Sequence, residues 1–472
     1  MAFFHGNRVG IVPGSEPRTV EVTSGIAFVV GTAPVHTVNG AVNEVLRFSA
    51  FPEARSALGY SDDWEKYTLS EVMECHFREF QVGPVFFVNV LDPARHRRAV
   101  QAAPYPVQDR QVKLPFEAIA DTVKVDGGEL GADFAVFYTG GACVLEIVPG
   151  GALAGKSTVS VEYEAVDPGL VTALDIIGGQ DVVTGARSGF ELISVCIPKY
   201  QVAPDLIICP KWSKGPAVAA VMDAKTFISS VLYASALVDL PAPGGTKYAE
   251  VPELKKKAGN FTSGDTSLCW PKVRRAGKVY HLSTRMAAVI SRTDAANDGF
   301  PSDSPSNRPL LADSVVLDDG TEVLLDLPEA NYLNANGIVT ALNFANGWTL
   351  WGNYTGAFPE RTHPQYAFLS VNRMMKRLAN STVLEFWRRT DGRMTRRFVG
   401  ALVDEANISM NGLVSNGHLL GGRVEVFPEA NPVEDLMAGI IRPHIFATPP
   451  SPAQKIDWSL EYDMGYFAAL FS

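Results

Sequence analysis

Residues 150–157, GGALAGKS, satisfy the phosphate-loop pattern GxxxxGK[ST], in which backbone amides and a lysine hold the phosphates of a nucleotide. This chemistry requires a helix directly after the glycines, because the amides at a helix N-terminus bind the phosphates. Residues 158–166 instead alternate apolar and polar side chains with a period of two, which is typical of a strand. The motif therefore predicts a hairpin connection between two strands, and we expect no ATP binding.

Other residue types that could do chemistry lack the required spacing. The eight histidines include no HxxxH or HExxH pair, and no GxSxG elbow is present. The segment 294–305 resembles a calcium loop, but Ala296 and Pro305 stand at ligand positions. The cysteines form no CxxC pair and lie in apolar segments, which predicts reduced core residues: Cys75, Cys143, Cys196, Cys209 and Cys269. We predict no catalytic residues, no cofactor and no metal.

The elements that would position any site form an α/β body over 25–102 and 167–360. Continuous apolar runs, typical of strands buried on both faces, occur at 25–31, 83–90, 205–209 and 236–240. Helical patterns lie between them, at 69–80 and over about 20 residues from Ser213. Because strand and helix alternate, we expect a layered α/β fold.

Two further regions have a different pattern. Residues 103–166 contain short alternating segments separated by Gly and Pro turns, which predicts an all-β insertion. Residues 361–446 predict a C-terminal α/β core domain with helices at 364–389 and 394–410, then a strand at 418–427, a short capped helix at 431–436 and a returning strand at 439–446.

The region 373–397 carries eight basic residues against two acidic ones, in a chain of 472 residues with a formal net charge of −10. The basic residues are Arg373, Lys376, Arg377, Arg388, Arg389, Arg393, Arg396 and Arg397. A solvated helix face, an acidic protein partner and phosphate all fit this pattern. The overall acidity argues against a general nucleic-acid binder. No apolar run approaches the roughly 20 residues of a membrane span, and the N-terminus has no signal region, so we expect a cytosolic product.

Both ends of the chain predict extended arms, over 1–24 and 447–472. In the C-terminal arm, three prolines at 449–452 prevent a helix or central strand, and apolar residues then alternate with polar ones at 456–463. Ordering about ten residues costs ~10–20 kcal/mol of backbone entropy, whereas burying four large apolar side chains contributes ~6–12 kcal/mol. The arm therefore needs a sheet edge, supplied by its own domain or, through strand addition, by another chain.

Segments spread over most of the chain carry a resemblance to a known family. In order they are FHGNRV, SGIAFVVGTAP, VGPVFFVNVLDP, PDLIICPKWS, HLSTRMAAVISRTDAANDGFPSDSPSN, YLNANGIVTALNFANGWTLWGN and LLGGRVEVFPEANPVEDLMAGIIRPHIFATPPSPAQKIDWSLEYD. Their order resembles that of the contractile tail sheath proteins of myophages, R-type bacteriocins and related injection systems. The resemblance does not cover the insertion at 103–166; such insertions vary in the family and are expected to face outward. Residues 353–355, NYT, replace the Arg-Thr pair more often found after Trp-Gly, so they receive no role.

The resemblance implies a structural subunit rather than an enzyme. Sheath subunits form six-fold rings stacked helically around a tail tube, their arms add strands to the sheets of neighbouring subunits, and contraction drives the tube through the target envelope. The implied partners are other copies, the tail tube protein, and baseplate and tail terminator proteins, with no direct nucleic-acid contact and no membrane insertion. The expected location is the virion tail, or a bacteriocin or injector particle, after assembly in the cytoplasm of the producing bacterium.

The resemblance also assigns residues to surfaces. The inter-subunit arm residues are Val9, Ile11, Val20, Val22, Ile456, Trp458, Leu460 and Tyr462. The strand-accepting sheet contains Leu419, Val424, Val426, Ile441 and Ile445. The eight basic residues of 373–397 are the candidates for a tube-facing surface.

Two other classes of protein remain open. A static shell or tube-like assembly protein would use the same arms without contraction. An α/β enzyme would need a pocket in which polar side chains converge.

Overall fold

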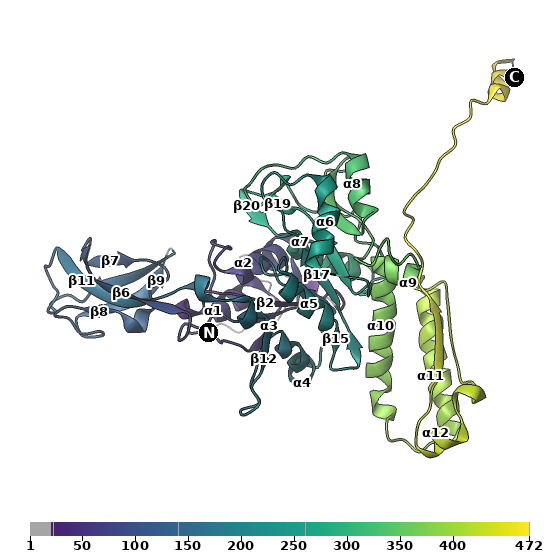
Figure 1. The fold of residues 1–472 in the computed structure, drawn as a ribbon, viewed down its shortest axis with the longest axis horizontal. Coiled ribbons are helices and arrows are strands. Elements are labelled where there is room, and N and C mark those ends of the chain that lie inside the picture. Colours follow the sequence, from purple (N-terminus) through teal and green to yellow (C-terminus); the bar gives the residue numbers. More distant parts are fainter. Residues whose placement is uncertain (1–19, 22, 140, 260, 472) are drawn as a thin grey trace, which may run out of the picture.

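A mixed sheet of eight strands forms the centre of the computed structural model, which describes residues 20–21, 23–139, 141–259 and 261–471 (Figure 1). The strand order is β23-β22-β18-β17-β14-β2-β5-β3, and β3 and β23 are its antiparallel edges. The strands are β2 (Ala27–Gly31), β3 (Val45–Phe48), β5 (Val85–Asn89), β14 (Leu206–Ile208), β17 (Ser235–Asp239), β18 (Thr266–Cys269), β22 (Ile338–Asn343) and β23 (Trp348–Trp351). The four apolar runs predicted as buried strands are confirmed as β2, β5, β14 and β17.

Helices pack around this sheet and share its apolar core. They are α1 (Phe51–Leu58), α2 (Thr68–Met73), α3 (Ala173–Ile177), α4 (Cys196–Tyr200), α5 (Pro216–Ala224), α6 (Val251–Ala258), α7 (Leu282–Ala296) and α8 (Leu327–Asn334). The helix predicted at 69–80 is confirmed, although its second half, Glu74–Phe80, is a π-helix. Small strands complete the body: β1 (Val20–Glu21), β4 (Val82–Gly83), β12 (Gly178–Gln180), β13 (Arg187–Gly189), β15 (Phe227–Ile228), β16 (Leu232–Tyr233), β19 (Lys272–Arg275), β20 (Lys278–Tyr280) and β21 (Ser314–Val316).

The helix predicted over about 20 residues from Ser213 is wrong. Helix α5 has 9 residues, and the β15–β16 hairpin follows it. Ser229 and Ser230 form the turn of this hairpin with positive φ angles of 50° and 59°, which a helix cannot contain. The aromatic and β-branched residues on either side favour strands over continuation of the helix.

The predicted all-β region forms two three-stranded sheets with an apolar core of their own. Its strands are β6 (Arg97–Pro106), β7 (Gln111–Leu114), β8 (Lys124–Val125), β9 (Phe134–Thr139), β10 (Ala142–Ile147) and β11 (Thr158–Val166), so the first strand begins at Arg97. This part projects from the body at the left of Figure 1. The strand predicted after the phosphate-loop motif is confirmed as β11. The hairpin is wrong, because β10 and β11 lie in different sheets, and the glycines cross from one sheet to the other.

The C-terminal part combines two long helices with a two-stranded sheet. Its elements are α9 (Pro364–Ala367), α10 (Leu369–Phe386), α11 (Arg396–Ser415), β24 (Gly421–Glu425), α12 (Val433–Met437) and β25 (His444–Thr448). The predicted order of strand, short helix and returning strand is confirmed, with shorter strands. Apolar side chains of α10, α11, β24 and the turn before β24 form a small core of their own: Met374, Leu378, Ala406, Met410, Leu419 and Val424.

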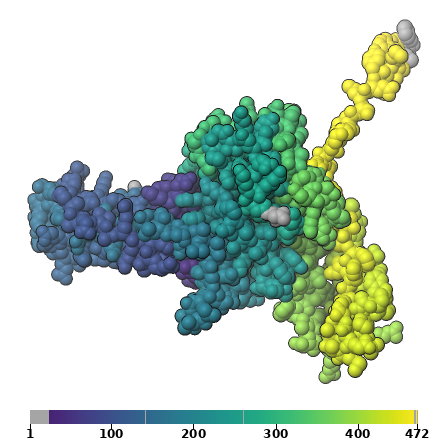
Figure 2. Space-filling model, viewed as in Figure 1, coloured from purple at the N-terminus to yellow at the C-terminus, as the bar shows by residue number. Residues whose placement is uncertain are grey.

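Beyond β25 the chain leaves the body as an extended tail that ends in a 3-10 helix, Met464–Phe471 (Figures 1 and 2). The strand predicted at 456–462 does not form within the single chain, because no sheet edge lies beside it. At the other end, Val9, Ile11 and Val22 lie outside the described residues. The backbone of Val20 pairs in parallel with Val82 of the same chain. In the described part of the chain, no helix has the length and apolarity needed to span a membrane.

Candidate assembly interface

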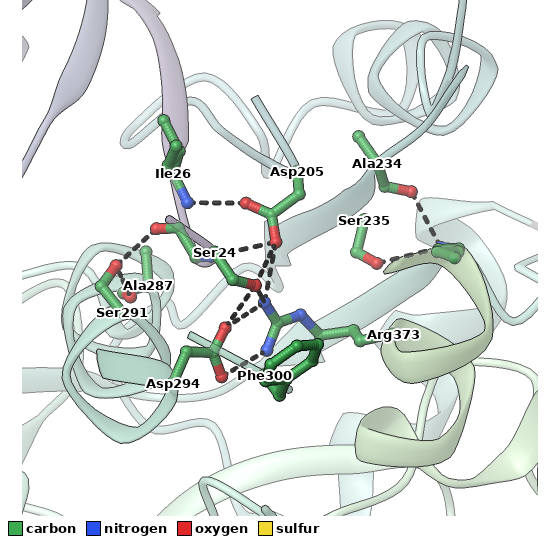
Figure 3. Close-up of polar contacts among 12 residues, drawn as sticks. Ser24, Ile26, Asp205, Ala234, Ser235, Ala287, Ser291, Asp294, Phe300 and Arg373 are labelled. Carbon is green, nitrogen blue, oxygen red and sulfur yellow. Dashed lines mark hydrogen bonds and ion pairs between the residues drawn. The ribbon is translucent and has the colours of Figure 1, made fainter. Parts of the chain in front are cut away.

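Helix α10 is anchored to the body by Arg373, whose side chain is only 4% exposed (Figure 3). Its guanidinium donates to both carboxylate oxygens of Asp294 on α7, at 3.1 and 2.6 Å, and to Asp205 at 2.9 Å. Ser24 Oγ lies within hydrogen-bond distance of the same two carboxylates, 3.1 Å from Asp205 and 2.9 Å from Asp294. Burial lowers the pKa of the Arg373 guanidinium, but the carboxylates of Asp294 and Asp205 outweigh burial and hold that pKa above its usual value. The cation is therefore charged and held within the chain.

Lys376, on the same face of α10, makes a second anchor. Its ammonium donates to the Ala234 carbonyl oxygen at 2.8 Å and to Ser235 Oγ at 2.9 Å, and it pairs with Asp265 at 2.8 Å. Burial lowers the pKa of Lys376, against the opposing effect of the Asp265 carboxylate.

The two anchors place α10 across one end of the central sheet. Asp205 directly precedes β14, Ser235 begins β17, Asp265 directly precedes β18, and Ser24 precedes β2. All four positions lie at the amino ends of parallel strands. Asp205 also accepts the backbone N–H of Ile26 at 2.6 Å, which ties the start of β2 into the same network.

Arg373 and Lys376 were predicted to face the tube, and the structure contradicts this. A residue that faces a partner must reach the surface, whereas these two cations are buried against carboxylates of their own chain. Arg377 is half-buried, with its guanidinium 5.6 Å from the centre of the Phe300 ring. The exposed members of the basic set gather where α10 ends and α11 begins: Arg388, Arg389, Arg393, Arg396 and Arg397.

One edge of the two-stranded sheet is closed by the side chain of Asn407, which sequence reasoning missed. On α11, the Asn407 amide accepts the Val424 N–H at 2.8 Å and donates to the Val424 carbonyl oxygen at 3.0 Å. A residue whose two backbone groups point away from the partner strand belongs to a non-hydrogen-bonded pair. The backbone N–H and carbonyl oxygen of Val424 therefore point outward from the β24 edge, and Asn407 takes the place of a neighbouring strand there. A single asparagine within a helical pattern gives no sequence signal for this role.

The opposite edge, formed by β25, is open. Ile445 is the register partner of Val424, so its N–H and carbonyl oxygen also point away from the pair. Ala447, two residues further along β25, has the same orientation. Among the described residues, neither has a backbone hydrogen bond outside the β24–β25 pair.

The predicted strand-accepting residues occupy different positions around this sheet. Leu419, before β24, and Val424, within β24, have buried side chains, and Ile445 lies in β25. Val426 and Ile441 lie outside the two strands, which corrects the predicted boundaries. Before β25, the N–H of Arg442 bonds to Asn431 at 2.7 Å and Pro443 has no N–H to donate, so pairing starts only at His444.

An apolar groove of about 820 Å³ opens beside this sheet, between the α10–α11 hairpin and the segment that leads into β25. Its main apolar lining residues are Phe386, Phe398, Leu402, Ile440, Ile441 and Ile445. Val424 and Ile445 are register partners, so the groove continues the face of the sheet that packs on the helices.

The C-terminal arm exposes the apolar residues that were predicted to pack on a partner. Trp458 is 90% exposed, and Ile456, Leu460 and Tyr462 are also exposed. Within the described chain, one side-chain hydrogen bond joins the arm to the body, from Tyr354 Oη to Gln454 at 2.7 Å.

The described residues contain no group of three or more His, Cys, Asp or Glu side chains placed to hold a metal ion. A polar pocket of about 360 Å³ lies between α10 and the amino ends of the strands, next to Arg373, Lys376 and Asp205. Those three side chains pair with one another or with neighbours in the chain. The pocket therefore presents ion pairs already satisfied rather than a group poised for acid–base or nucleophilic chemistry.

Several solved structures share this fold. One chain of the anti-feeding prophage baseplate matches with a TM-score of 0.59 and 12% identity, covering 98% of this chain and 100% of that one. The sheath complex of the extracellular contractile injection system PVC, in the contracted state, matches with a TM-score of 0.57 and 11% identity, covering 98% and 99%. The contracted helical sheath of the anti-feeding prophage matches with a TM-score of 0.56 and 13% identity, covering 97% and 99%.

The sequence has a curated relative as well. The chain is 28% identical to the tail sheath protein of Burkholderia phage BcepMu over 480 residues, which cover 97% of this chain and 96% of that protein. No family model matches the chain. The resemblance to the tail sheath proteins is thus confirmed: the chain is a homologue of a tail sheath protein and has the fold of sheath subunits.

Proposed function

We propose that this protein is the structural subunit of a contractile tail sheath, which polymerises as stacked hexameric rings around a tail tube and contracts to drive the tube through a target envelope. The proposal rests on the presence, in one chain, of an arm without a partner and a two-stranded sheet with one open edge. The arm exposes four large apolar side chains, and β25 offers an open edge. The protein acts mechanically, without catalysis or a cofactor.

The arm of one copy adds a strand to the β25 edge of a neighbour. Asn407 already occupies the β24 edge, so a further strand can be added only at the β25 edge. Main-chain hydrogen bonds supply the affinity, and the stripe from Ile456 to Tyr462 supplies specificity by extending the apolar face beneath Ile445. Residues 449–455, which we call the leash, lie between β25 and the added strand. The leash can therefore change direction while this strand pairing persists during contraction.

The exposed cations at the end of the α10–α11 hairpin face the tail tube in the extended state. These residues are Arg388, Arg389, Arg393, Arg396 and Arg397. Exposed charges exchange partners at low cost, because a surface ion pair contributes only ~0–1 kcal/mol. Such contacts can break when the sheath expands, whereas the arm contacts remain. Baseplate and terminator proteins cap the two ends of the stack.

Deletion of residues 449–472 tests the proposal. Since β25 ends at Thr448, this truncation removes the arm and leaves the accepting sheet whole. We expect a folded monomer with the circular dichroism spectrum of the full chain that forms no sheaths in electron micrographs. Sheaths of normal length from the truncated chain would contradict the arm assignment.

A static shell would use the same arm and edge without changing its diameter. Electron microscopy of purified particles before and after a contraction trigger, such as mild acid or urea, separates the two functions. We expect two lattices of different diameter, and one diameter under every condition would favour the static shell.

A further inference from the structure

The arm ends in a second apolar feature that strand addition does not use. After the stripe, Met464–Phe471 turns into a 3-10 helix, and the Asp463 carboxylate accepts the Gly465 N–H at 2.8 Å at its start. Four of its large side chains are exposed: Met464, Tyr466, Phe467 and Leu470. We call Met464–Leu470 the tip. A short isolated helix is unstable in water, and this one gains little from packing within its own chain.

The tip matches the apolar groove in chemistry and size. The groove is lined by aliphatic and aromatic side chains, and its volume of about 820 Å³ falls in the range of sites that enclose a ligand of several side chains.

The position, length and direction of the arm favour binding of the tip in the groove of another copy over binding in the groove of its own chain. Ile445 lines the groove and lies only a few residues before Thr448, where the leash starts. The 15 residues from 449 to 463 can span ~50 Å at ~3.3–3.6 Å per residue. Beyond Thr448 the arm runs away from the body of its own chain (Figure 1).

The position of the groove also sets the direction of the added strand. The groove lies at the start of β25, next to Pro443 and Ile445. An arm that pairs antiparallel to β25 brings its own C-terminal end to this place, whereas a parallel arm would carry the tip to the opposite end, near Thr448.

We propose that the tip of one copy binds in the apolar groove of a second copy, so that the arm adds antiparallel to β25 and the bound tip fixes its register. This inference rests on the proposed strand addition and goes beyond it. A strand pair alone permits slippage by two residues, which the seated tip prevents.

Cross-linking in the full chain tests the tip. Leu470→Cys is combined with Leu402→Cys, which lies in the groove on α11. The matched control combines Leu470→Cys with Ile408→Cys, an exposed position on the same helix outside the groove. The five native cysteines are buried, so they should not react. Assembled sheaths are treated with a short bismaleimide and separated on denaturing gels.

We expect a ladder of covalent multimers from the groove pair and little from the control pair. A cross-linked monomer would place the tip in its own groove and overturn the second-copy assignment. Equal or absent multimers from both pairs, in sheaths that assemble normally, would overturn the tip site and leave strand addition standing. Failure of the unmodified chain to assemble would overturn the proposed function and this inference with it.

A substitution provides an independent readout. Phe467→Asp places a charge in the apolar groove, so we expect the concentration required for assembly to rise about ten- to hundred-fold. Ser459→Asp, on the polar face of the arm, should change the concentration required for assembly by no more than about two-fold, since surface substitutions have small effects. An equal rise for both variants would contradict a specific role of the tip.

Discussion

Arg373 shows that the role of a basic residue depends on whether its side chain is buried or exposed. Its charge is satisfied by Asp294 and Asp205, and these carboxylates are in turn satisfied by Arg373, Ser24 and backbone N–H groups. Taking such charges out of water costs several kcal/mol per ion, so the network is stable only when complete. Removal of one member leaves an uncompensated charge inside the protein.

Arg373→Met is therefore expected to destabilise the chain by about 3–5 kcal/mol, because Asp294 loses its cation while remaining buried. Urea unfolding of the arm-truncated monomer measures the change. Arg388→Met, at an exposed position, serves as the control and should stay within about 0.5 kcal/mol. Similar values for both variants would show that Arg373 is not a structural anchor.

Asn407→Leu removes the groups that close the β24 edge. We expect a loss of about 1–3 kcal/mol, because the Val424 N–H and carbonyl oxygen lose their partners. The opened edge should also produce irregular aggregates alongside sheaths. Unfolding midpoints and electron micrographs measure the two effects, with Ile408→Ala as the exposed control on the same helix. Ordered sheaths of unchanged stability would contradict the closing role.

At the scale of elements, the α10–α11 hairpin has two ends with different tasks. The first half of α10 is buried against the amino ends of the sheet through Arg373 and Lys376. The far end carries the exposed cations and borders the groove. One pair of helices thus connects the rigid body to both proposed contact surfaces.

Charge reversal at the far end tests the tube contact. Arg388→Glu, Arg393→Glu and Arg396→Glu are combined, while Arg389 is retained because it pairs with Glu405 within the chain. Opposite charges across an interface change to like charges, so co-assembly with the tube should fall at least about ten-fold. Tube-free polysheath should be much less affected. Sedimentation with and without purified tube measures both.

The control reverses three exposed cations on the insertion: Arg110, Lys113 and Lys156. This triple variant should assemble on the tube as the unmodified chain does. Equal loss of tube-bound sheath and polysheath in the hairpin variant would assign its cations to contacts between subunits instead.

At the scale of the whole molecule, the chain is built from parts with separate cores. The insertion has its own apolar cluster, and Arg97 and Val166, at its two ends, are register partners. Its contacts with the body include the hydrogen bond between His36 and the Phe116 carbonyl group at 2.9 Å, the packing of Phe116 on the main core, and the Lys66–Glu117 ion pair. This arrangement lets the insertion project without disturbing the central sheet.

Replacing residues 98–165 with a short Gly-Ser turn should leave assembly intact and reduce the outer diameter of the sheath. A lower melting temperature is expected, because His36 loses its hydrogen bond to the Phe116 carbonyl oxygen and its contact with the Phe116 ring. Electron microscopy and thermal unfolding measure the two effects. A folded variant that forms no sheath would place the insertion at a contact between subunits.

The sequence predicted the features that depend on neighbouring residues. Continuous apolar runs predicted four of the eight central strands, and period-two alternation predicted the all-β insertion, because burial on one or both faces leaves a local pattern. The same local information was insufficient after Ala224, where the Ser229–Ser230 turn ended a predicted helix. It also could not show that β10 and β11 lie in different sheets, since pairing is a contact between distant segments.

The sequence by itself thus determined many of the elements, the need of the C-terminal arm for a sheet edge, and the relation to sheath proteins. Only the tertiary structure decided which basic residues are buried, which sheet edge is open and where the groove lies. The partners of Arg373 are 168 and 79 residues away along the chain, and Asn407 is 17 residues from Val424. The energy of a charge or a strand edge depends on the atoms around it in space, and those atoms come from distant parts of the sequence.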